Sequence, residues 1–120
     1  MKKILVVDDS SVVRMSLEML LKDNGFDVVC ANDGVQGVDA AKGSKFDLII
    51  TDINMPNMNG FDLIQNVRQM DQCKFIPILV LTTESDSEML KKGKNFGATG
   101  WIVKPFTNES LLSTVNRVIS

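Results

Sequence analysis

Polar side chains that can carry chemistry follow several short apolar segments of the chain, at the point where each segment ends. These side chains are Asp8 and Asp9, Asp52, Thr82 with Thr83, and Lys104. Carboxylates gathered without a counter-ion repel one another and resist ionisation, whereas a divalent cation accepts oxygen ligands from all of them. A group of ligands rich in oxygen and free of sulfur and imidazole favours Mg²⁺, with Mn²⁺ as the alternative. Lys104 would add a compact positive charge to such a site.

The 120 residues include two cysteines and no histidine. Without imidazole, Ser-His-Asp and Cys-His catalysis are excluded, so any chemistry must come from carboxylates, hydroxyls, lysine or a hard metal ion. Cys30 and Cys73 lie far apart in the sequence, which excludes a CxxC redox motif and a zinc site built on paired thiolates. We expect both to be reduced thiols in packing positions.

The net charge is −2, and the basic residues are scattered, so the charge pattern does not indicate nucleic-acid binding. The longest apolar runs, such as residues 77–81, are far shorter than the roughly 20 residues that span a bilayer. Asp8 and Asp9 interrupt the apolar run behind the basic N-terminus before a signal-peptide core could form. We therefore expect residues 1–120 to form one cytoplasmic domain, monomeric, that binds neither nucleic acid nor membrane.

Short apolar segments alternate with segments of helical periodicity along the whole chain, which is typical of repeated strand–helix units. Strands are expected at residues 4–7, 28–31, 48–51, 78–81 and 101–103. Continuous β-branched strands suit a parallel sheet that is buried on both faces. Right-handed crossovers then place helices on both faces of a five-stranded sheet, and ligands bind beyond the carboxyl ends of its strands.

Five helices are expected after these strands. The first is capped by Ser10 or Ser11 and stopped by Gly25, and the second is capped by Asp33, with Val35, Val38 and Ala41 facing inward. The third covers residues 61–70 and the fourth residues 85–96. The fifth begins at Thr107 or Asn108. The helix at 85–96 has few apolar positions and contains Gly93, so we expect it to be the least stable. The methionines at positions 15, 19, 55, 58, 70 and 89 are interpreted as packing or loop residues.

Ordered motifs surround the polar strand ends. They are VVDDS at 6–10, TDINMPNMNG at 51–60, Thr82 after LVL, GATGW at 97–101 and VKPF at 103–106. With these motifs the chain resembles, over essentially its whole length, the receiver domains of two-component response regulators, and in particular the single-domain, CheY-like regulators of bacterial chemotaxis. The resemblance implies a flavodoxin-like, doubly wound (βα)5 fold with strand order 2-1-3-4-5 and a cis bond before Pro105.

The resemblance also implies a phosphoacceptor site. Asp52 would be phosphorylated by a phosphohistidine of a sensor kinase, of the chemotaxis type. Asp9, Asp52 and the backbone carbonyl of Asn54 would coordinate Mg²⁺, and Asp8 would reach the ion directly or through water. Lys104 and the Thr82 hydroxyl would neutralise the phosphoryl oxygens, which suits a reaction that needs mostly positioning and charge neutralisation. Such a chain promotes its own phosphorylation and dephosphorylation and is not a turnover enzyme.

In this family, Thr82 would move toward the phosphoryl group and Trp101 would change its packing. The helix at 85–96, the last strand and the last helix would form the surface for a downstream partner, of which the flagellar motor switch is the obvious one. Asn54, Thr83 and Glu84 would tune the lifetime of the phosphoryl group. The segment after Thr82 is acidic where motor-binding members tend to be basic, so a phosphate-sink paralogue or one with another target stays open.

Simpler interpretations stay open for single residues. Asp8 and Asp9 could be helix N-terminal charges, Thr82 a β-branched strand residue, and Trp101 a static core indole. A haloacid dehalogenase also uses a strand-end Asp with Mg²⁺, but it normally carries a second Asp where this chain has Asn54. A nucleotide-binding module of the same fold would need a Gly-rich loop after the first strand, which is not found here.

Overall fold

The computed structural model describes residues 1–83 and 87–119, and within them strands and helices alternate. The strands are β1 (Lys3–Val7), β2 (Asp27–Ala31), β3 (Leu48–Asp52), β4 (Ile78–Thr82) and β5 (Gly100–Val103). The helices are α1 (Ser11–Asp23), α2 (Gly34–Gly43), α3 (Gly60–Arg68), α4 (Ser87–Phe96) and α5 (Asn108–Val118), with a short 3-10 turn, η1, at Asp71–Cys73. Glu84 lies outside the described residues.

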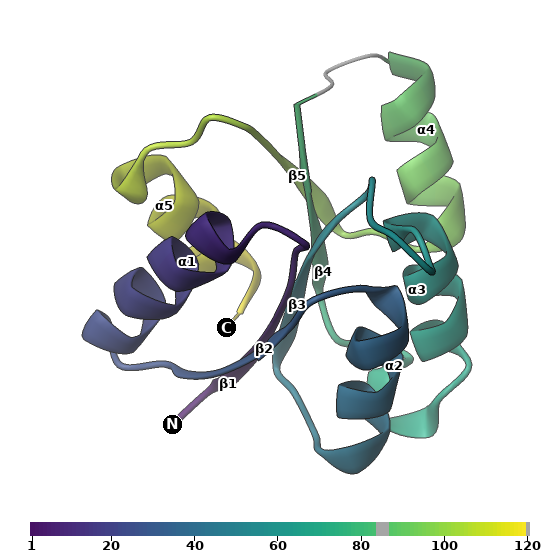
Figure 1. Ribbon diagram of the computed structural model, residues 1–120, viewed down its shortest axis with the longest axis horizontal. Helices are drawn as coiled ribbons and strands as arrows, with labels where there is room; N and C mark the ends of the chain where they lie inside the picture. Colours follow the sequence, from purple (N-terminus) through teal and green to yellow (C-terminus); the bar gives the residue numbers. More distant parts are fainter. Residues whose placement is uncertain (84–86, 120) are drawn as a thin grey trace.

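The strands form one parallel sheet in the order β2-β1-β3-β4-β5, which confirms the predicted fold and strand order. Helices α1 and α5 cover one face, and α2, α3 and α4 cover the other (Figure 1). No helix among the described residues is both long enough and apolar enough to cross a membrane.

Burial on both faces explains why the strands are apolar without alternation. Every residue of β3 and of β4 is buried. In β1, Leu5 and Val7 pack with the cluster under α2 and α3, whereas Ile4 and Val6 pack with the cluster under α1 and α5. Full burial of one such side chain contributes about 1.5–3 kcal/mol, so the sheet is a rigid base for the residues at its edges.

Side-chain caps fix where the helices begin. Ser10, not Ser11, caps α1 by accepting a hydrogen bond from the Val13 amide, and Asp33 caps α2 as predicted. Thr107 caps α5 through a reciprocal capping box with Ser110. These oxygens satisfy amides that have no partner inside the helix.

Several sequence predictions differ from the structure. Val35 is 43% exposed rather than inward-facing, because the buried side of α2 consists of Gly34, Gly37, Val38 and Ala41. On α1, Met15 and Met19 are 63% and 62% exposed, so neither is a packing residue. Helix α3 ends at Arg68 instead of residue 70, because the chain then turns into η1, which buries Cys73.

The cysteines differ in their surroundings. Both are free thiols; Cys73 is buried, as expected, and Cys30 is half-buried. The Cys30 thiol lies 3.4 Å from a carboxylate oxygen of Glu18. Burial, and then the bond to and charge of Glu18, raise the pKa of Cys30 to about 11, so this thiol stays protonated.

The Arg68 guanidinium ties three segments together behind the sheet. It donates to the carbonyl oxygens of Cys73 at 2.8 Å and Ile76 at 2.6 Å, which precede β4. It also donates twice to Gly97, at 2.7 and 3.2 Å, in the turn after α4. Arg68 therefore fixes where α4 ends relative to α3.

Replacing this clamp is expected to cost stability. Arg68→Met keeps much of the aliphatic stem but leaves these carbonyl groups without their charged donor, so we expect the free energy of unfolding in urea to fall by about 2–3 kcal/mol. Arg117→Met, at an exposed position of α5, is the matched control and should change it by less than about 0.5 kcal/mol. Equal effects of the two substitutions would show that the clamp does not stabilise the fold.

Candidate functional site

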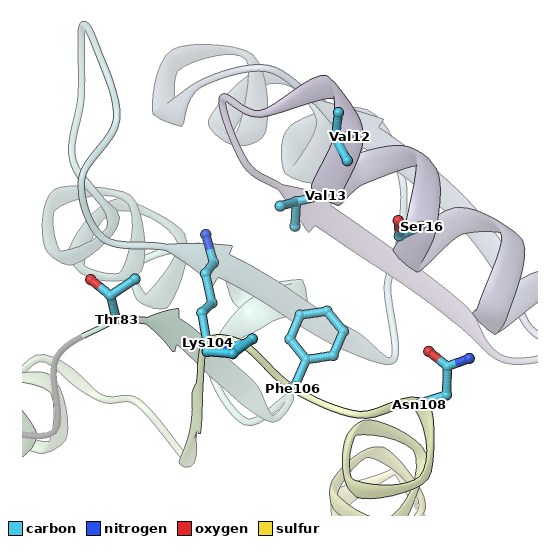
Figure 2. Close-up of a pocket in the computed structure, with 8 residues that line it drawn as sticks. Val12, Val13, Ser16, Thr83, Lys104, Phe106 and Asn108 are labelled. Carbon is cyan, nitrogen blue, oxygen red and sulfur yellow. The ribbon is translucent and has the colours of Figure 1, made fainter.

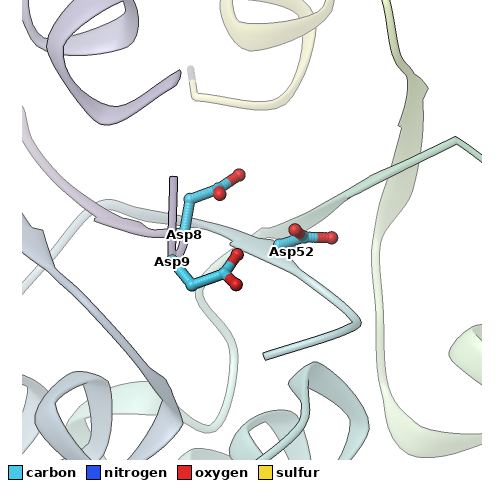
Figure 3. A group of neighbouring side chains, drawn as sticks. All are labelled: Asp8, Asp9 and Asp52. Carbon is cyan, nitrogen blue, oxygen red and sulfur yellow. The ribbon is translucent and has the colours of Figure 1, made fainter. Parts of the chain in front are cut away.

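The carboxylates predicted at the strand ends lie together at the carboxyl edge of the sheet. Val7 pairs with Thr51 across β1 and β3, so Asp8 and Asp52 follow from neighbouring strands at the same level. Oxygen atoms of Asp8, Asp9 and Asp52 all lie within 4.8 Å of one another, as the close-up in Figure 3 shows. Asp8 is fully buried, Asp52 is nearly buried and Asp9 is exposed.

Lys104 completes the cluster from the far edge of the sheet. Thr82 pairs with Val103, and the Lys104 amide donates to the Thr82 carbonyl at 2.7 Å. The Lys104 ammonium lies 3.0 Å from an oxygen of Asp8 and 3.1 Å from an oxygen of Asp52. The peptide bond between Lys104 and Pro105 is cis, as predicted. One ammonium group therefore bridges two nearly buried carboxylates.

The charges of the cluster perturb one another. The pKa of Asp52 is raised, because burial disfavours its ionised form; Lys104 opposes this shift and the charge of Asp8 adds to it. Burial by itself would lower the pKa of Lys104, but the bonds to and charges of Asp8 and Asp52 raise it above the usual value. Lys104 is thus held as a cation between the two carboxylates.

This donor set fits a hard divalent cation. When ionised, the three carboxylates outweigh the one ammonium by two negative charges. Among the described residues, Asp9 shares no hydrogen bond or ion pair, although its carboxylate reaches the cluster. Oxygen ligands of this kind suit Mg²⁺ or Mn²⁺ and not a soft metal.

The backbone carbonyl of Asn54, predicted as a further ligand, belongs to the loop between β3 and α3. Asn54 follows Asp52 by two residues and is exposed. The loop returns to the site at Gly60, whose amide donates to the Ile53 carbonyl at 2.8 Å. A β-carbon at position 60 would lie only 2.1 Å from the Asp52 carbonyl oxygen, so this close approach requires glycine.

The remaining predicted residues lie at the same edge or behind it. Thr82 ends β4 and is buried, and Thr83 is exposed. Trp101 pairs with Val80 and is half-buried against the cluster under α2 and α3.

A pocket that the sequence did not predict opens beside the charged cluster. Its volume is about 390 Å³, and it separates α1 from the ends of β4 and β5 (Figure 2). It is lined by Val12, Val13, Ser16, Thr83, Lys104, Pro105, Phe106 and Asn108. Val12 is 72% exposed, and an apolar residue outside the buried stripe of α1 is the signal that could have revealed this opening.

The comparisons with known proteins agree with this geometry. The model of the response regulator receiver domain family matches residues 4–116. The chemotaxis protein CheY-3 of Vibrio cholerae serotype O1 is 38% identical over 117 residues, which is 97% of this chain and 90% of that protein. The chemotaxis protein CheY of Pseudomonas aeruginosa is 36% identical, over 97% of this chain and 94% of that protein.

Solved structures resemble the whole fold. The chemotaxis response regulator CheY4 of Vibrio cholerae, crystallised at low pH, superimposes with a TM-score of 0.96 at 48% identity, covering 98% of both chains. The receiver domain of a sensor histidine kinase from Pseudomonas aeruginosa gives a TM-score of 0.91 at 26% identity, covering 98% of this chain and 97% of that one. That structure has a magnesium ion coordinated in its active site cleft.

The raised pKa of Asp52 predicts a pH-dependent effect on stability. The folded protein holds the Asp52 proton more tightly than the unfolded chain, so this group's stabilising contribution is present below the unfolded pKa, about 3.9, and is lost as pH rises through the folded pKa. Asp52→Asn removes the ionised group. Without divalent cations, we expect the variant to be more stable than the wild type at pH 7.5, with a difference that shrinks toward pH 4.

Urea unfolding of both proteins across this pH range, in the presence of a chelator, measures the difference. Asp71→Asn is the control, because its side chain is 97% exposed, and it should show little dependence on pH. A variant at position 52 that is less stable than the wild type at pH 7.5 would contradict the electrostatic interpretation.

Proposed function

Because the chain belongs to the response regulator receiver domain family, we propose that it is a signalling switch that accepts a phosphoryl group on Asp52 from a phosphohistidine of a sensor kinase. The observation that carries this proposal is the Lys104 ammonium, which lies 3.1 Å from Asp52 and 3.0 Å from Asp8 at the open edge of the sheet. It holds a cation beside the Asp52 carboxylate, where the cation can offset part of the negative charge of an entering phosphoryl group.

The transfer needs a nucleophile and charge compensation. A carboxylate oxygen of Asp52 attacks phosphorus, the new O–P bond forms, and the N–P bond to the donor imidazole breaks with its electron pair leaving on nitrogen. The Ile53 amide donates to the other carboxylate oxygen at 2.7 Å and so orients the group. Lys104 would pair with a phosphoryl oxygen, and Thr82, at the end of the adjoining strand β4, would donate its hydroxyl proton to another.

Receiver domains bind Mg²⁺ at an acidic pocket, and the Asp cluster here provides one. We propose that Asp8, Asp9, Asp52 and the backbone carbonyl of Asn54 hold the ion, with Mn²⁺ as an alternative. A magnesium ion coordinated in the cleft of the similar Pseudomonas receiver domain supports this proposal. When bound, the ion supplies positive charge for the phosphoryl oxygens.

Thr82 and Trp101 would convert phosphorylation into a change of surface. Thr82 stands at the carboxyl edge, and Trp101 lies half-buried on the neighbouring strand, two residues before the strand's end. An inward movement of Thr82 would free space into which the indole can repack. The surface that responds is formed by α4, β5 and α5. To shift the ratio of active to inactive conformations from 1:99 to 99:1, the phosphoryl group would have to interact with the active conformation about 5.5 kcal/mol more favourably than with the inactive one.

The lifetime of the phosphoryl group would depend on neighbours of the reacting atoms. Asn54 is exposed two residues after Asp52, and Thr83 lines the pocket beside Lys104. Glu84 belongs to this proposal from its sequence position alone. Chemotaxis regulators of the family commonly carry a smaller residue at this position. The Thr83 side chain would therefore narrow the path by which a phosphodonor reaches Asp52.

Similarity to two chemotaxis proteins over nearly the whole chain supports a chemotaxis-associated role. We propose that residues 1–120 act as one receiver domain in the cytoplasm, as a monomer that binds neither nucleic acid nor membrane, with a chemotaxis-type histidine kinase as donor and a protein target that is the flagellar motor switch or another partner. A phosphate-sink paralogue is the alternative. Membership of the family removes the dehalogenase and nucleotide-binding alternatives.

Trp101 fluorescence tests the switch. Addition of Mg²⁺ and then of a beryllofluoride phosphate mimic is expected to change the emission of the wild type, because the indole is the single tryptophan of the chain and repacks on activation. The response should vanish in Asp52→Asn and persist in the control Asp71→Asn. If emission does not change while calorimetry detects Mg²⁺ binding, the Trp101 part is wrong; if no Mg²⁺ binds, the receiver mechanism is wrong.

Removing the Thr83 side chain tests access to Asp52. Thr83→Ala is expected to speed labelling by a small phosphodonor such as phosphoramidate several-fold, since it widens the pocket on the side of Lys104. Thr83→Ser keeps the hydroxyl and loses the methyl, so it separates steric from polar effects, and Ser16→Ala changes the opposite wall as a control. An unchanged labelling rate in Thr83→Ala would exclude steric restriction.

A further inference from the structure

The loop between β3 and α3, residues 53–59, carries Asn54 and connects the phosphoacceptor strand to α3. Its base is closed where the Gly60 amide donates to the Ile53 carbonyl at 2.8 Å, and its tip is tightened by the Met58 amide on the Pro56 carbonyl at 2.7 Å. Neither bond reaches the rest of the molecule. Ile53 anchors the start of the loop in the cluster under α2 and α3, and the Met58 sulfur lies 3.9 Å from the side-chain amide of Asn66 on α3. The orientation of the tip over the sheet edge depends in addition on contacts with a second helix.

These additional contacts are made with the N-terminus of α2. The Asn57 side-chain amide donates to one carboxylate oxygen of Asp33 at 2.8 Å, across 24 positions of sequence. The other carboxylate oxygen of Asp33 accepts from the Gln36 amide at 2.9 Å and caps α2. Asp33 thus uses its two oxygens for two different elements, so the loop is fixed to a helix that is itself packed on the sheet.

The backbone conformation of Asn57 favours asparagine at the position that donates this hydrogen bond. Asn57 has φ of +69°, in the left-handed region that asparagine tolerates better than most residues. Beside it, Met58 lies directly on Gly34: a β-carbon at position 34 would approach the Met58 carbonyl oxygen to 2.5 Å. The hydrogen bond joins Asn57 to Asp33, and the close contact joins Met58 to Gly34. Two adjacent residues of the loop thus contact two adjacent residues at the N-terminus of α2.

Ionisation of Asp33 keeps the bond available at neutral pH. The backbone bond from Gln36, and then the side-chain bond from Asn57, lower the pKa of Asp33 below its usual value. An ionised carboxylate accepts more strongly than a neutral acid. Asp33 does not belong to the carboxylate cluster of Asp8, Asp9 and Asp52.

We propose that Asp33 and Asn57 form a latch that holds residues 53–59 in the conformation that presents the Asn54 carbonyl to the metal ion, so that metal affinity depends on a hydrogen bond remote from the carboxylate cluster. Asp33 is a positioning residue and does not touch the ion. The proposal rests on the proposed function, in which the Asn54 carbonyl is a ligand. Loss of outer hydrogen bonds that orient metal ligands typically weakens metal binding by 10- to 100-fold.

Two substitutions open the latch without removing other functions of the same residues. Asp33→Ser keeps an oxygen that caps α2 but is too short to reach Asn57. Asn57→Gly removes the amide but tolerates the left-handed backbone. The matched control is Asn59→Ser, which retains the cap of α3 in the same loop and leaves the latch intact.

Calorimetric titration with Mg²⁺ measures the effect at the site. We expect the dissociation constant to rise about tenfold in Asp33→Ser and in Asn57→Gly, to rise no further in the double variant, and to stay unchanged in Asn59→Ser. Additive effects in the double variant, or unchanged affinity in both single variants, would overturn the latch while leaving the proposed function in place.

Hydrogen exchange of the metal-free protein gives a readout that does not depend on the ion. The Met58 and Gly60 amides should exchange faster in Asp33→Ser and Asn57→Gly than in the wild type, whereas the Ile49 amide, bonded to Pro77 at 3.1 Å within the sheet, should not change. Unchanged loop exchange would overturn the latch. If the wild type binds no Mg²⁺, the proposed function and the metal part of this inference are wrong, and the exchange rates alone decide whether the latch holds the loop.

Discussion

The bridge from Lys104 to Asp8 and Asp52 is the interaction on which the site depends. Two carboxylates at the ends of adjacent strands would repel each other in a nearly buried place, and the ammonium at 3.0 and 3.1 Å compensates part of that charge. Compensation is incomplete, because Asp9 reaches the same cluster. In the proposed function, the remaining negative charge would attract a divalent cation, and that cation would offset the charge of a phosphoryl group.

A rigid sheet makes this balance of charges possible. The strands β1 and β3, which lead into Asp8 and Asp52, are buried along almost their whole length, so their ends cannot move apart to relieve repulsion without disturbing the packing on both faces. The charged groups therefore stay close in the absence of a ligand, and the protein holds electrostatic strain that a ligand relieves. Preorganisation of this kind spares a reaction the cost of gathering charges when it occurs.

In the proposed switch, the parts that respond to phosphorylation would be less firmly held than the sheet. Helix α4 contacts α3 through stacked rings of Phe61 and Phe96, 5.5 Å between centroids, with the Lys92 ammonium 4.9 Å from the Phe61 centroid. Phe61 directly follows Gly60, which packs against the Asp52 backbone. The loop after β3 and the helix α4 are thus physically connected, and contacts of this size, about 0.5–1.5 kcal/mol each, can be exchanged without unfolding the domain.

The sequence by itself determined the alternation of five strands with five helices, the cap at Asp33 and which polar residues would meet, because apolar periodicity and strand-end position are local properties and parallel strands share one carboxyl edge. The strand order was implied by the family resemblance, and the choice of Thr107 over Asn108 as the cap of α5 came from the structure. Tertiary structure alone decided how the groups pair. Lys104 pairs with Asp8, and Asn57 donates to Asp33, although the two residues of each pair lie far apart in the sequence. Val35 is exposed because other residues of α2 face the sheet. These pairings and this exposure depend on how whole elements pack, and no local pattern carries that information.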